Sequence, residues 1–336
     1  MMETTAHYLG VDGGGSKTAF ALVDSHGVVS ARVTAASSYY FNSSPDAMER
    51  VLGEGVSQVC AAAGITTEQI DAAFFGLPGY GEASADVAEL DAMPARILGH
   101  DRYRCGNDMV CGWAGSLVGE DGINVISGTG SMTYGERLGV GHRVGGWGEL
   151  FGDEGSAYWI ATRGLNAFSR MSDGRIPRGP LHGLLGERLE ISSDLDAVGL
   201  IIGTWGGDRS RIAALATTVC EAAREGDSEA IRVVSDAVRE LATLIETTRS
   251  LLGFGDDEVV PVSYSGGMFT DDGYLASFRA ALAELPAEYD LRVPLLDPAL
   301  GAAVYAAKNA RTPFSTAALQ RLCGTHTPTD EVEINE

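Results

Sequence analysis

The fold is decided by the stretch Tyr8-Leu-Gly-Val-Asp-Gly-Gly-Gly-Ser-Lys-Thr-Ala-Phe-Ala-Leu-Val23, in which two short apolar runs flank three glycines. The first run ends in Asp12, and the second, Thr18–Val23, has the composition of a β-strand. A P-loop has a shorter spacing before its lysine and must open a helix that holds the phosphates, so this stretch is not a P-loop. A dinucleotide-binding fingerprint fails for the same reason. The stretch therefore predicts a β-hairpin with a glycine bend.

The bend has the composition of an anion-binding turn. Glycines let backbone N–H groups approach an anion closely, and a hydroxyl such as that of Ser16 adds a donor. Asp12 stands at the strand end, where it could hold a hydrated Mg²⁺ with one or two carboxylates and phosphate oxygens. Lys17 either assists with phosphate or is simply exposed. The alternative is an ordinary tight turn in which Asp12 bonds its own backbone.

A second glycine turn repeats the first further along the chain. The segments Asp12–Thr18 and Ser127–Thr133 lie 115 residues apart and agree at four of seven positions. The matching pairs are Gly13/Gly128, Gly15/Gly130, Ser16/Ser131 and Thr18/Thr133. Each turn follows one apolar strand and precedes another. The repeat predicts two halves of similar build.

The rest of the chain alternates short strands with helices. A length of 336 residues favours two domains, since domains usually contain about 100–200 residues. Further strands are predicted at Val28–Val33, Ala72–Phe75, Tyr103–Cys105, Ile123–Ile126, Val259–Tyr264 and Leu291–Leu295, and helices at about 45–63, 156–170, 194–202, 210–225, 228–252 and 298–309. The glycine-rich segment Gly141–Gly155 is predicted to be a functional loop.

Composition narrows the class of partner and the location. The chain has 24 Lys+Arg against 46 Asp+Glu, and no basic run offsets the net charge of −22, so nucleic acid is not expected as a partner. The charge by itself indicates no more than solubility. No apolar stretch is long enough to span a membrane, and the N-terminus does not read as a signal peptide. Five cysteines without a C-x-x-C spacing indicate a reducing compartment. We expect a cytoplasmic protein.

Four motifs stand out together: Val11-Asp-Gly-Gly-Gly-Ser16, Asn107-Asp108, Ile126-Ser-Gly-Thr-Gly-Ser131 and Gly145-Gly-Trp-Gly-Glu-Leu-Phe-Gly-Asp-Glu-Gly-Ser-Ala-Tyr-Trp159. They resemble the N-acetylglucosamine kinases, which belong with the BadF/BadG/BcrA/BcrD-type ATPases in the actin–hexokinase–Hsp70 fold group. The resemblance covers about residues 8–310, and its last motif is the most specific.

The resemblance implies an α/β fold of two actin-like (ribonuclease H-like) domains with a central cleft. The first domain would be residues 1–115, completed by a C-terminal helix at about 298–324. The second would be residues 116–297, with a helical insertion. Residues 325–336 are polar and acidic, so we expect a disordered tail there. The family also suggests a homodimer.

The resemblance further implies which residues bind ATP, Mg²⁺ and a sugar. The implied ATP-binding residues are Gly13, Gly14, Gly15, Ser16, Lys17, Thr18, Gly128, Thr129, Gly130 and Ser131, with Ser265, Gly266, Gly267 and Met268 on the adenosine side. The implied metal residues are Asp12 and Asp108. The implied sugar-side residues are Asn42, Gly79, Asn107, Asp108, Thr129, Gly146, Trp147, Asp153, Glu154 and Ala157. The loop Ser37–Asn42 is longer and more aromatic than the family pattern.

Asp108 is the candidate catalytic base. Phosphoryl transfer to an alcohol needs a carboxylate that accepts the hydroxyl proton, and Asp108 stands where a strand gives way to a helix near Met109. The alternative is a helix N-cap. Asp153 and Glu154 could accept hydrogen bonds from ring hydroxyls or could favour the dipole of the helix near Ser156.

The favoured activity is phosphorylation of N-acetylglucosamine to its 6-phosphate. Variants of this hypothesis are a kinase for glucosamine or for N-acetylmuramic acid. A second hypothesis is an ATP-driven activator of a dehydratase, which by family resemblance would carry an iron–sulfur cluster, although paired cysteines are not evident. A third is a non-catalytic sugar sensor. The intact glycine turns and Asp108 argue against the third.

Overall fold

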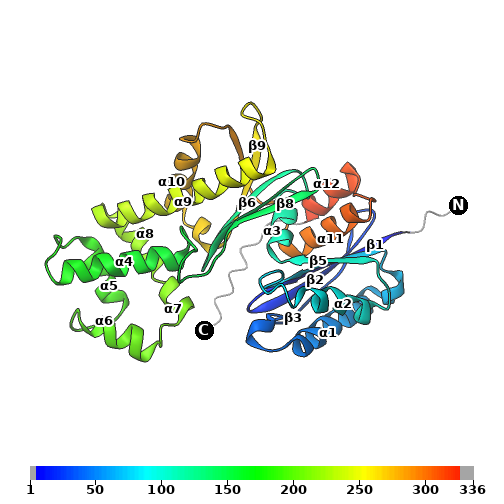
Figure 1. The fold of residues 1–336 in the computed structure, drawn as a ribbon, viewed down its shortest axis with the longest axis horizontal. Helices are drawn as coiled ribbons and strands as arrows, with labels where there is room; N and C mark the ends of the chain where they lie inside the picture. Colours follow the sequence, from blue (N-terminus) through cyan, green and yellow to red (C-terminus); the bar gives the residue numbers. More distant parts are fainter. Residues whose placement is uncertain (1–4, 326–336) are drawn as a thin grey trace. The chain divides into compact units, whose positions relative to one another are not determined.

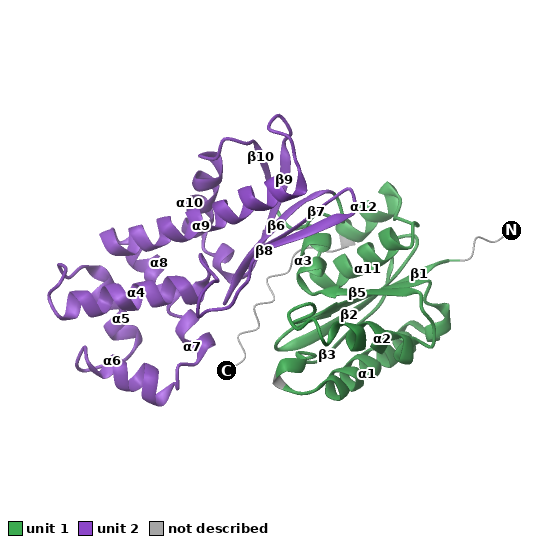
Figure 2. Cartoon of the chain, viewed as in Figure 1, with its two compact units in different colours: residues 1–120, 293–336 green, residues 121–292 purple. Residues whose placement is uncertain are grey.

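The computed structural model describes residues 5–325, apart from the side chains of Asn42 and Thr325. The chain forms two compact units, drawn in different colours in Figure 2. Unit 1 combines residues 1–120 with 293–336, and unit 2 comprises residues 121–292. The predicted domain limits, after residues 115 and 297, each lie five residues from the limits of these units. Residues 326–336 of the expected tail lie outside the described part of the chain.

Unit 1 is built on a five-stranded mixed sheet in the order β3-β2-β1-β4-β5. Its strands are β1 (His7–Gly13), β2 (Lys17–Asp24), β3 (Val29–Ala36), β4 (Ala72–Leu77) and β5 (Tyr103–Asn107). β1 and β2 pair antiparallel, with Gly13 opposite Thr18, whereas β1, β4 and β5 run parallel. The predicted glycine hairpin is therefore confirmed, and the parallel strands carry Asp12 and Asn107 to the same edge of the sheet.

Unit 2 repeats this topology with the order β8-β7-β6-β9-β10. Its strands are β6 (Gly122–Ser127), β7 (Ser131–Arg137), β8 (Val140–Gly145), β9 (Val260–Ser265) and β10 (Tyr289–Arg292). The meander β6–β7–β8 is antiparallel, and β6, β9 and β10 run parallel. The sequence repeat thus corresponds to a structural repeat, and the predicted α/β fold class with two actin-like sheets is confirmed.

The helices of unit 1 pack against both faces of its sheet (Figure 1). They are α1 (Pro45–Ala63), α2 (Val87–Leu98), α3 (Met109–Ser116), α11 (Pro298–Asn309) and α12 (Thr316–Thr325), with short 3₁₀ turns η1 (Tyr40–Asn42) and η2 (Thr67–Gln69). The predicted limits of α1 are confirmed: Ser44 Oγ accepts a hydrogen bond from Ala47 N at 3.2 Å, and Gly64 ends the helix with φ of 70°. The sequence did not predict α2, which contains Pro94, a residue that normally ends a helix.

Close backbone approach explains two glycines of unit 1. A Cβ atom at Gly10 of β1 would lie 2.1 Å from Ala299 O of α11. A Cβ atom at Gly301 of α11 would lie 2.2 Å from Gly115 N of α3. Because real Cβ atoms do not come that close, α11 can pack against β1 and α3 only with glycine at these positions.

Unit 2 carries a larger set of helices. They are α4 (Ala157–Ser172), α5 (Pro180–Arg188), α6 (Asp196–Val198), the π-helix η3 (Gly199–Thr204), α7 (Arg209–Ala213), α8 (Ala216–Arg224), α9 (Ser228–Leu252), the 3₁₀ turn η4 (Gly267–Thr270) and α10 (Asp272–Ala283). Buried side chains from α4, α8, α9 and α10 form one core with β6 and β9. In the described part of the chain, no helix is both long enough and apolar enough to cross a membrane.

Several local predictions in unit 2 were wrong. The helix predicted at 210–225 is divided between α7 and α8, and that at 194–202 continues as a π-helix to Thr204. The predicted loop begins later, because Gly141–Gly145 belong to β8, where pairing with β7 is made by the backbone and tolerates glycine. The strand predicted at Leu291–Leu295 ends at Arg292, since Pro294 has no N–H to donate to a ladder.

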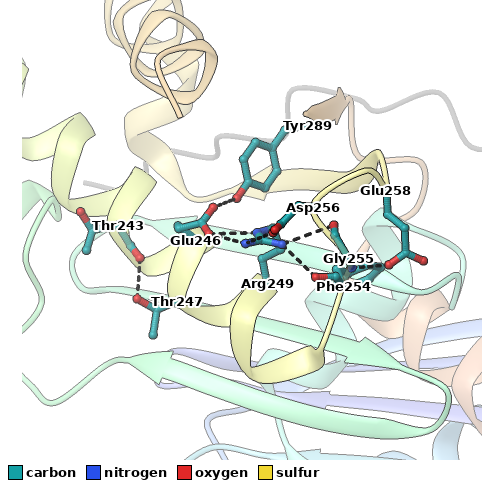
Figure 3. A network of polar contacts seen from close by, with 9 residues as sticks. All are labelled: Thr243, Glu246, Thr247, Arg249, Phe254, Gly255, Asp256, Glu258 and Tyr289. Carbon is teal, nitrogen blue, oxygen red and sulfur yellow. Dashed lines mark hydrogen bonds and ion pairs between the residues drawn. The ribbon is translucent and has the colours of Figure 1, made fainter. Parts of the chain in front are cut away.

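A polar network fixes the end of α9 to the segment that enters β9 (Figure 3). Arg249 is only 8% exposed; it donates to Glu246 Oε1 at 2.7 Å and to Phe254 O at 2.8 Å. Tyr289 of β10 donates its hydroxyl to the other oxygen of Glu246. The buried guanidinium is therefore paired and hydrogen-bonded, as a buried charge must be. The network therefore joins α9 to β10 and to the segment before β9.

Candidate active site

The first glycine turn closes the hairpin of β1 and β2 in unit 1. Asp12, at the end of β1, pairs across the ladder with Ala19 of β2 and with Gly76 of β4. A Cβ atom at Gly13 would lie 2.6 Å from both Pro78 Cδ and Ser38 Oγ. Position 13 therefore requires glycine because any side chain would clash with its neighbours, whether or not a ligand is bound.

The residues predicted to bind phosphate divide into two groups. Gly15, Ser16 and Lys17 are exposed, so the tip of the turn is accessible to a ligand. Thr18 is buried, and its hydroxyl donates to Ala36 O of β3 at 2.8 Å. Its repeat partner Thr133 is also buried and shares a hydrogen bond of 2.6 Å with the hydroxyl of Thr248. The Thr18 side chain thus ties β2 to β3, whereas the Thr133 side chain ties β7 to α9.

Asp108 begins α3 directly after β5. Its backbone is already helical (φ −58°, ψ −27°), and its side chain makes no capping hydrogen bond. Asn107 supplies the hydrogen bond at this helix start instead, because its Oδ1 accepts from Met109 N at 3.2 Å. The N-cap alternative for Asp108 is therefore wrong, and the role of its carboxylate lies outside helix capping.

Three carboxylates share the neighbourhood of the first glycine turn. Burial, and then the charges of Asp108 and Asp297, raise the pKa of Asp12 well above its ordinary value, whereas a hydrogen bond from the Cys111 thiol opposes this shift. Asp297 was not singled out by the sequence analysis. It caps α11 by accepting from Leu300 N at 3.1 Å, and it pairs with Arg32 at 2.7 Å. The only local feature of Asp297 in the sequence is its position before Pro298, and an aspartate in that position indicates no more than the start of a helix.

This neighbourhood fits a hydrated cation better than a fully protein-ligated one. Mg²⁺ keeps several waters and takes one or two carboxylates together with phosphate. Within residues 5–325, no group of three or more His, Cys, Asp or Glu side chains is arranged to ligate a metal. Burial and the neighbouring carboxylates disfavour the ionised form of Asp12, and the charge of a divalent ion beside Asp12 and Asp108 would offset both effects.

A change of Asp12 to Asn should stabilise the metal-free protein at alkaline pH. Because the folded-state pKa of Asp12 is raised, its contribution to stability is lost as pH rises from the ordinary value towards the folded-state value. Asn does not ionise, so the Asp12→Asn variant should melt at a higher temperature than the unchanged protein at about pH 8, and the difference should vanish at about pH 4.

The measurement is thermal unfolding in chelator across this pH range. Asp101→Asn, which changes an exposed carboxylate of the same unit, serves as the matched control and should give no such gap. A lower melting temperature of Asp12→Asn at alkaline pH would contradict this reading of the carboxylate group.

The sugar-side residues predicted in unit 1 lie near the ends of β4 and β5. Asn107 is buried, and its Nδ2 donates to Tyr80 O at 3.2 Å. Gly79 has a φ of 80° and is packed so tightly that a Cβ atom would lie 2.8 Å from the Phe41 ring. Asn42 lies in η1, and its side chain is outside the described residues. Asn107 therefore anchors the loop after β4 as well as the start of α3.

In unit 2, the second glycine turn is tied directly to the segment that precedes α4. Three hydrogen bonds join them: Ser127 Oγ donates to Gly155 O at 2.8 Å, Ala157 N to Gly128 O at 2.8 Å, and Ser131 Oγ to Glu154 O at 2.6 Å. The predicted phosphate residues and the predicted sugar residues Asp153, Glu154 and Ala157 are thus brought together. The hydroxyl of Ser131 is engaged in this contact.

Asp153 occupies an unusual position in that segment. It is 3% exposed and has a φ of 56°, in the left-handed region that residues other than glycine rarely adopt. Its Oδ1 accepts from Gly148 N at 3.3 Å, and its Oδ2 pairs with Arg209 of α7. Burial raises the pKa of Asp153, opposed mainly by the Arg209 charge. Arg209 was missed by the sequence analysis, which had no signal linking it to Asp153.

The predicted adenosine-side residues also adjoin the second turn. Gly266 has a φ of 101°, and a Cβ atom there would lie 2.3 Å from Ser127 O. Gly267 is exposed, and its N lies 3.8 Å from where a Cβ atom on Gly128 would be. Ser265 Oγ accepts from Asn124 Nδ2 at 3.2 Å, and Met268 is buried. The turn after β9 therefore lies beside the turn after β6, with Gly266 and Gly267 exposed.

The loop between β8 and α4 presents large apolar side chains to solvent. Trp147 is 71% exposed, and Leu150 and Phe151 are also exposed. Gly146 has a φ of 70°, and its carbonyl accepts from Arg143. Gly152 N donates to Gly148 O at 2.9 Å, which closes the loop on itself. Trp147 is therefore not a core residue. Thr129, at the tip of the neighbouring turn, is exposed too.

The sequence of the chain matches a known family of ATPases. The sequence profile of the BadF/BadG/BcrA/BcrD ATPase family matches residues 9–306. The chain belongs to this family. ATP binding is therefore expected of it, and the resemblance inferred from the four motifs is confirmed at the level of the family.

Two curated relatives each match most of the length of this BadF/BadG/BcrA/BcrD family member. An N-acetyl-D-glucosamine kinase from Dictyostelium discoideum is 28% identical over 310 residues, which are 89% of this chain and 97% of the relative. An N-acetylmuramic acid/N-acetylglucosamine kinase from Clostridium acetobutylicum is 31% identical over 271 residues, which are 80% of this chain and 87% of the relative.

Solved structures share the fold of this family member. A Chromobacterium violaceum protein assigned to the N-acetylglucosamine kinases superposes with a TM-score of 0.66 at 24% identity, covering 89% of this chain and 98% of the other. A ROK-family glucokinase from Streptomyces griseus superposes with a TM-score of 0.50 at 16% identity, covering 90% and 100%. At these identities the comparison supports the actin-like fold alone.

Proposed function

We propose that this protein is an ATP-dependent sugar kinase that phosphorylates the 6-hydroxyl of an amino sugar, with N-acetylglucosamine as its substrate. The observation that carries the proposal is the pair Asp12 and Asp108, which interact electrostatically beside an exposed glycine turn. The two curated relatives, both named as kinases of N-acetylated amino sugars, support the choice of substrate class.

In this proposal Asp108 is the general base. Its carboxylate accepts the proton of the sugar 6-hydroxyl as that oxygen attacks the γ-phosphorus of ATP. Phosphoryl transfer requires little covalent chemistry from the protein, so positioning and charge neutralisation supply most of the rate. Mg²⁺ held near Asp12 and Asp108 would neutralise phosphate charge. Asn107, which caps α3, orients the backbone that carries Asp108.

The glycine turns supply backbone donors to ATP in this proposal. We assign Gly13–Lys17 in unit 1, and Gly128–Gly130 with Gly266 and Gly267 in unit 2, to the nucleotide. The side chains of Thr18 and Ser131 support these turns from within, because their hydroxyls donate to Ala36 O and Glu154 O. Backbone N–H groups suit an acidic protein, since they bind an anion without requiring a basic surface.

The sugar is assigned to the loop of unit 2 that precedes α4. We propose that Asp153 and Glu154 accept hydrogen bonds from ring hydroxyls and that Trp147 packs on the sugar or its acetyl group. An exposed tryptophan between Gly146 and Gly148 can adjust to a ligand in a way that a core residue cannot. N-Acetylmuramic acid is the second candidate substrate, supported by the name of the Clostridium relative.

The proposal is tested by a coupled ADP-release assay with N-acetylglucosamine, N-acetylmuramic acid, glucosamine and glucose. N-Acetylglucosamine should give the highest kcat/KM, and the product should carry phosphate on carbon 6. ADP release at the same rate with and without every sugar would overturn the proposal. Sugar-independent ATP hydrolysis together with bound iron would support the dehydratase-activator alternative instead.

A further inference from the structure

Arg209 connects the helical insertion of unit 2 with the loop before α4. It begins α7, whose start is capped by Asp208 Oδ1 accepting from Arg211 N at 2.8 Å. Its Nη2 donates to Asp153 Oδ2, and its Nε lies 3.4 Å from Glu149 Oε2. One guanidinium therefore contacts two carboxylates of the same loop.

The ion pair of Arg209 and Asp153 lies against the second glycine turn. A Cβ atom at Gly130 would be 2.8 Å from Arg209 Nη2 and 2.9 Å from Asp153 Oδ2. Glycine at this position thus leaves room for the ion pair. The guanidinium and the carboxylate form one side of the turn that carries Thr129.

Asp153 needs this partner because of where it is held. A buried carboxylate without a cation is costly, and it either protonates or moves. The left-handed backbone of Asp153 adds strain that the surroundings must hold in place. Hydrogen bonds from the backbone of Gly148 and Ser131 stabilise the ionised form of Asp153. The Arg209 guanidinium supplies the positive charge that pairs with Asp153, and Glu149 adds a second negative charge nearby.

We propose that Arg209 is a positioning residue for the sugar: it keeps Asp153 ionised and oriented so that Asp153 can accept hydrogen bonds from the substrate hydroxyls. This inference rests on the proposed function. A direct role of Arg209 on the nucleotide is disfavoured by charge, because its two carboxylate partners would repel a triphosphate. The planar fork of arginine suits two carboxylates better than the point charge of lysine.

The test compares Arg209→Met and Arg209→Lys with Arg211→Met, which removes an exposed arginine of the same helix. KM and kcat are measured separately for the sugar and for ATP. We expect Arg209→Met to raise the sugar KM at least tenfold and to leave the ATP KM within twofold. Arg209→Lys should recover part of the sugar affinity, and Arg211→Met should match the unchanged protein. KM does not depend on the fraction of folded enzyme, so partial unfolding cannot imitate this result.

The pH profile provides a second readout. Removing Arg209 removes the positive charge that opposes the effect of burial on Asp153, while the negative charge of Glu149 remains, so Asp153 should protonate at higher pH. The acid limb of kcat/KM for the sugar should therefore move to higher pH in Arg209→Met and not in Arg211→Met.

Each outcome bears on a different statement. A raised ATP KM with an unchanged sugar KM would overturn the positioning role and indicate a nucleotide contact. Unchanged constants for both substrates in Arg209→Met would overturn it as well. If the unchanged protein phosphorylates no sugar at all, the proposed function fails, and the role of Arg209 fails with it.

Discussion

Replacing Asp108 by Asn should lower kcat by about 10²–10⁴-fold, the range typical of losing a general base. Asn keeps the size of the side chain but is neutral and cannot take the proton. The helix start does not depend on Asp108, since Asn107 accepts the hydrogen bond from Met109 N. The variant should therefore fold normally, and the decrease in kcat should come from a slower chemical step.

Stability separates a catalytic from a structural role of Asp108. Its charge raises the pKa of Asp12, so removing that charge relieves repulsion between two carboxylates. We expect the melting temperature of Asp108→Asn to equal or exceed that of the unchanged protein at alkaline pH. The measurements are steady-state kinetics and thermal unfolding, with Asp101→Asn as the exposed control. Activity of Asp108→Asn within threefold of the unchanged protein would contradict the assignment.

Replacing Gly301 by Ala should destabilise the protein by about 3 kcal/mol, at the upper end of what overpacking a core usually costs. Alanine in place of glycine inside a helix normally stabilises by about 1 kcal/mol, so the expected sign is reversed. The reason is space. The new methyl group would lie 2.2 Å from Gly115 N and 2.4 Å from Cys111 O, and both atoms belong to the backbone of α3. Helix backbones cannot yield as a flexible side chain can.

Gly183→Ala is the matched control for this change. Gly183 also lies inside a helix, α5, but it is exposed, and a Cβ atom there would meet nothing within 4 Å. The Gly183→Ala variant should have an unchanged free energy of unfolding or one raised by up to about 1 kcal/mol. Urea unfolding followed by circular dichroism measures both variants. An unfolding midpoint of Gly301→Ala at or above that of the unchanged protein would show that α3 and α11 are not packed as described.

Local patterns predicted much of the architecture. The apolar runs around each glycine bend indicated hairpins, and β1–β2 and β6–β7 are those hairpins. Ser44, Pro45 and Gly64 marked both ends of α1. These signals work because capping and turn formation involve residues a few positions apart. The failures occurred where no local signal was decisive, as at Pro94 inside α2.

The amino-acid sequence by itself determined the two repeated hairpins, the family and the candidate base Asp108, because each depends on residues that are neighbours along the chain. Only the tertiary structure decided that Asn107 rather than Asp108 caps α3, that Asp297 shares the neighbourhood of Asp12, and that Arg209 pairs with Asp153. The last two findings concern residues that are far apart in sequence, and the burial and charge around such residues depend on how the elements pack. No local spacing encodes that packing.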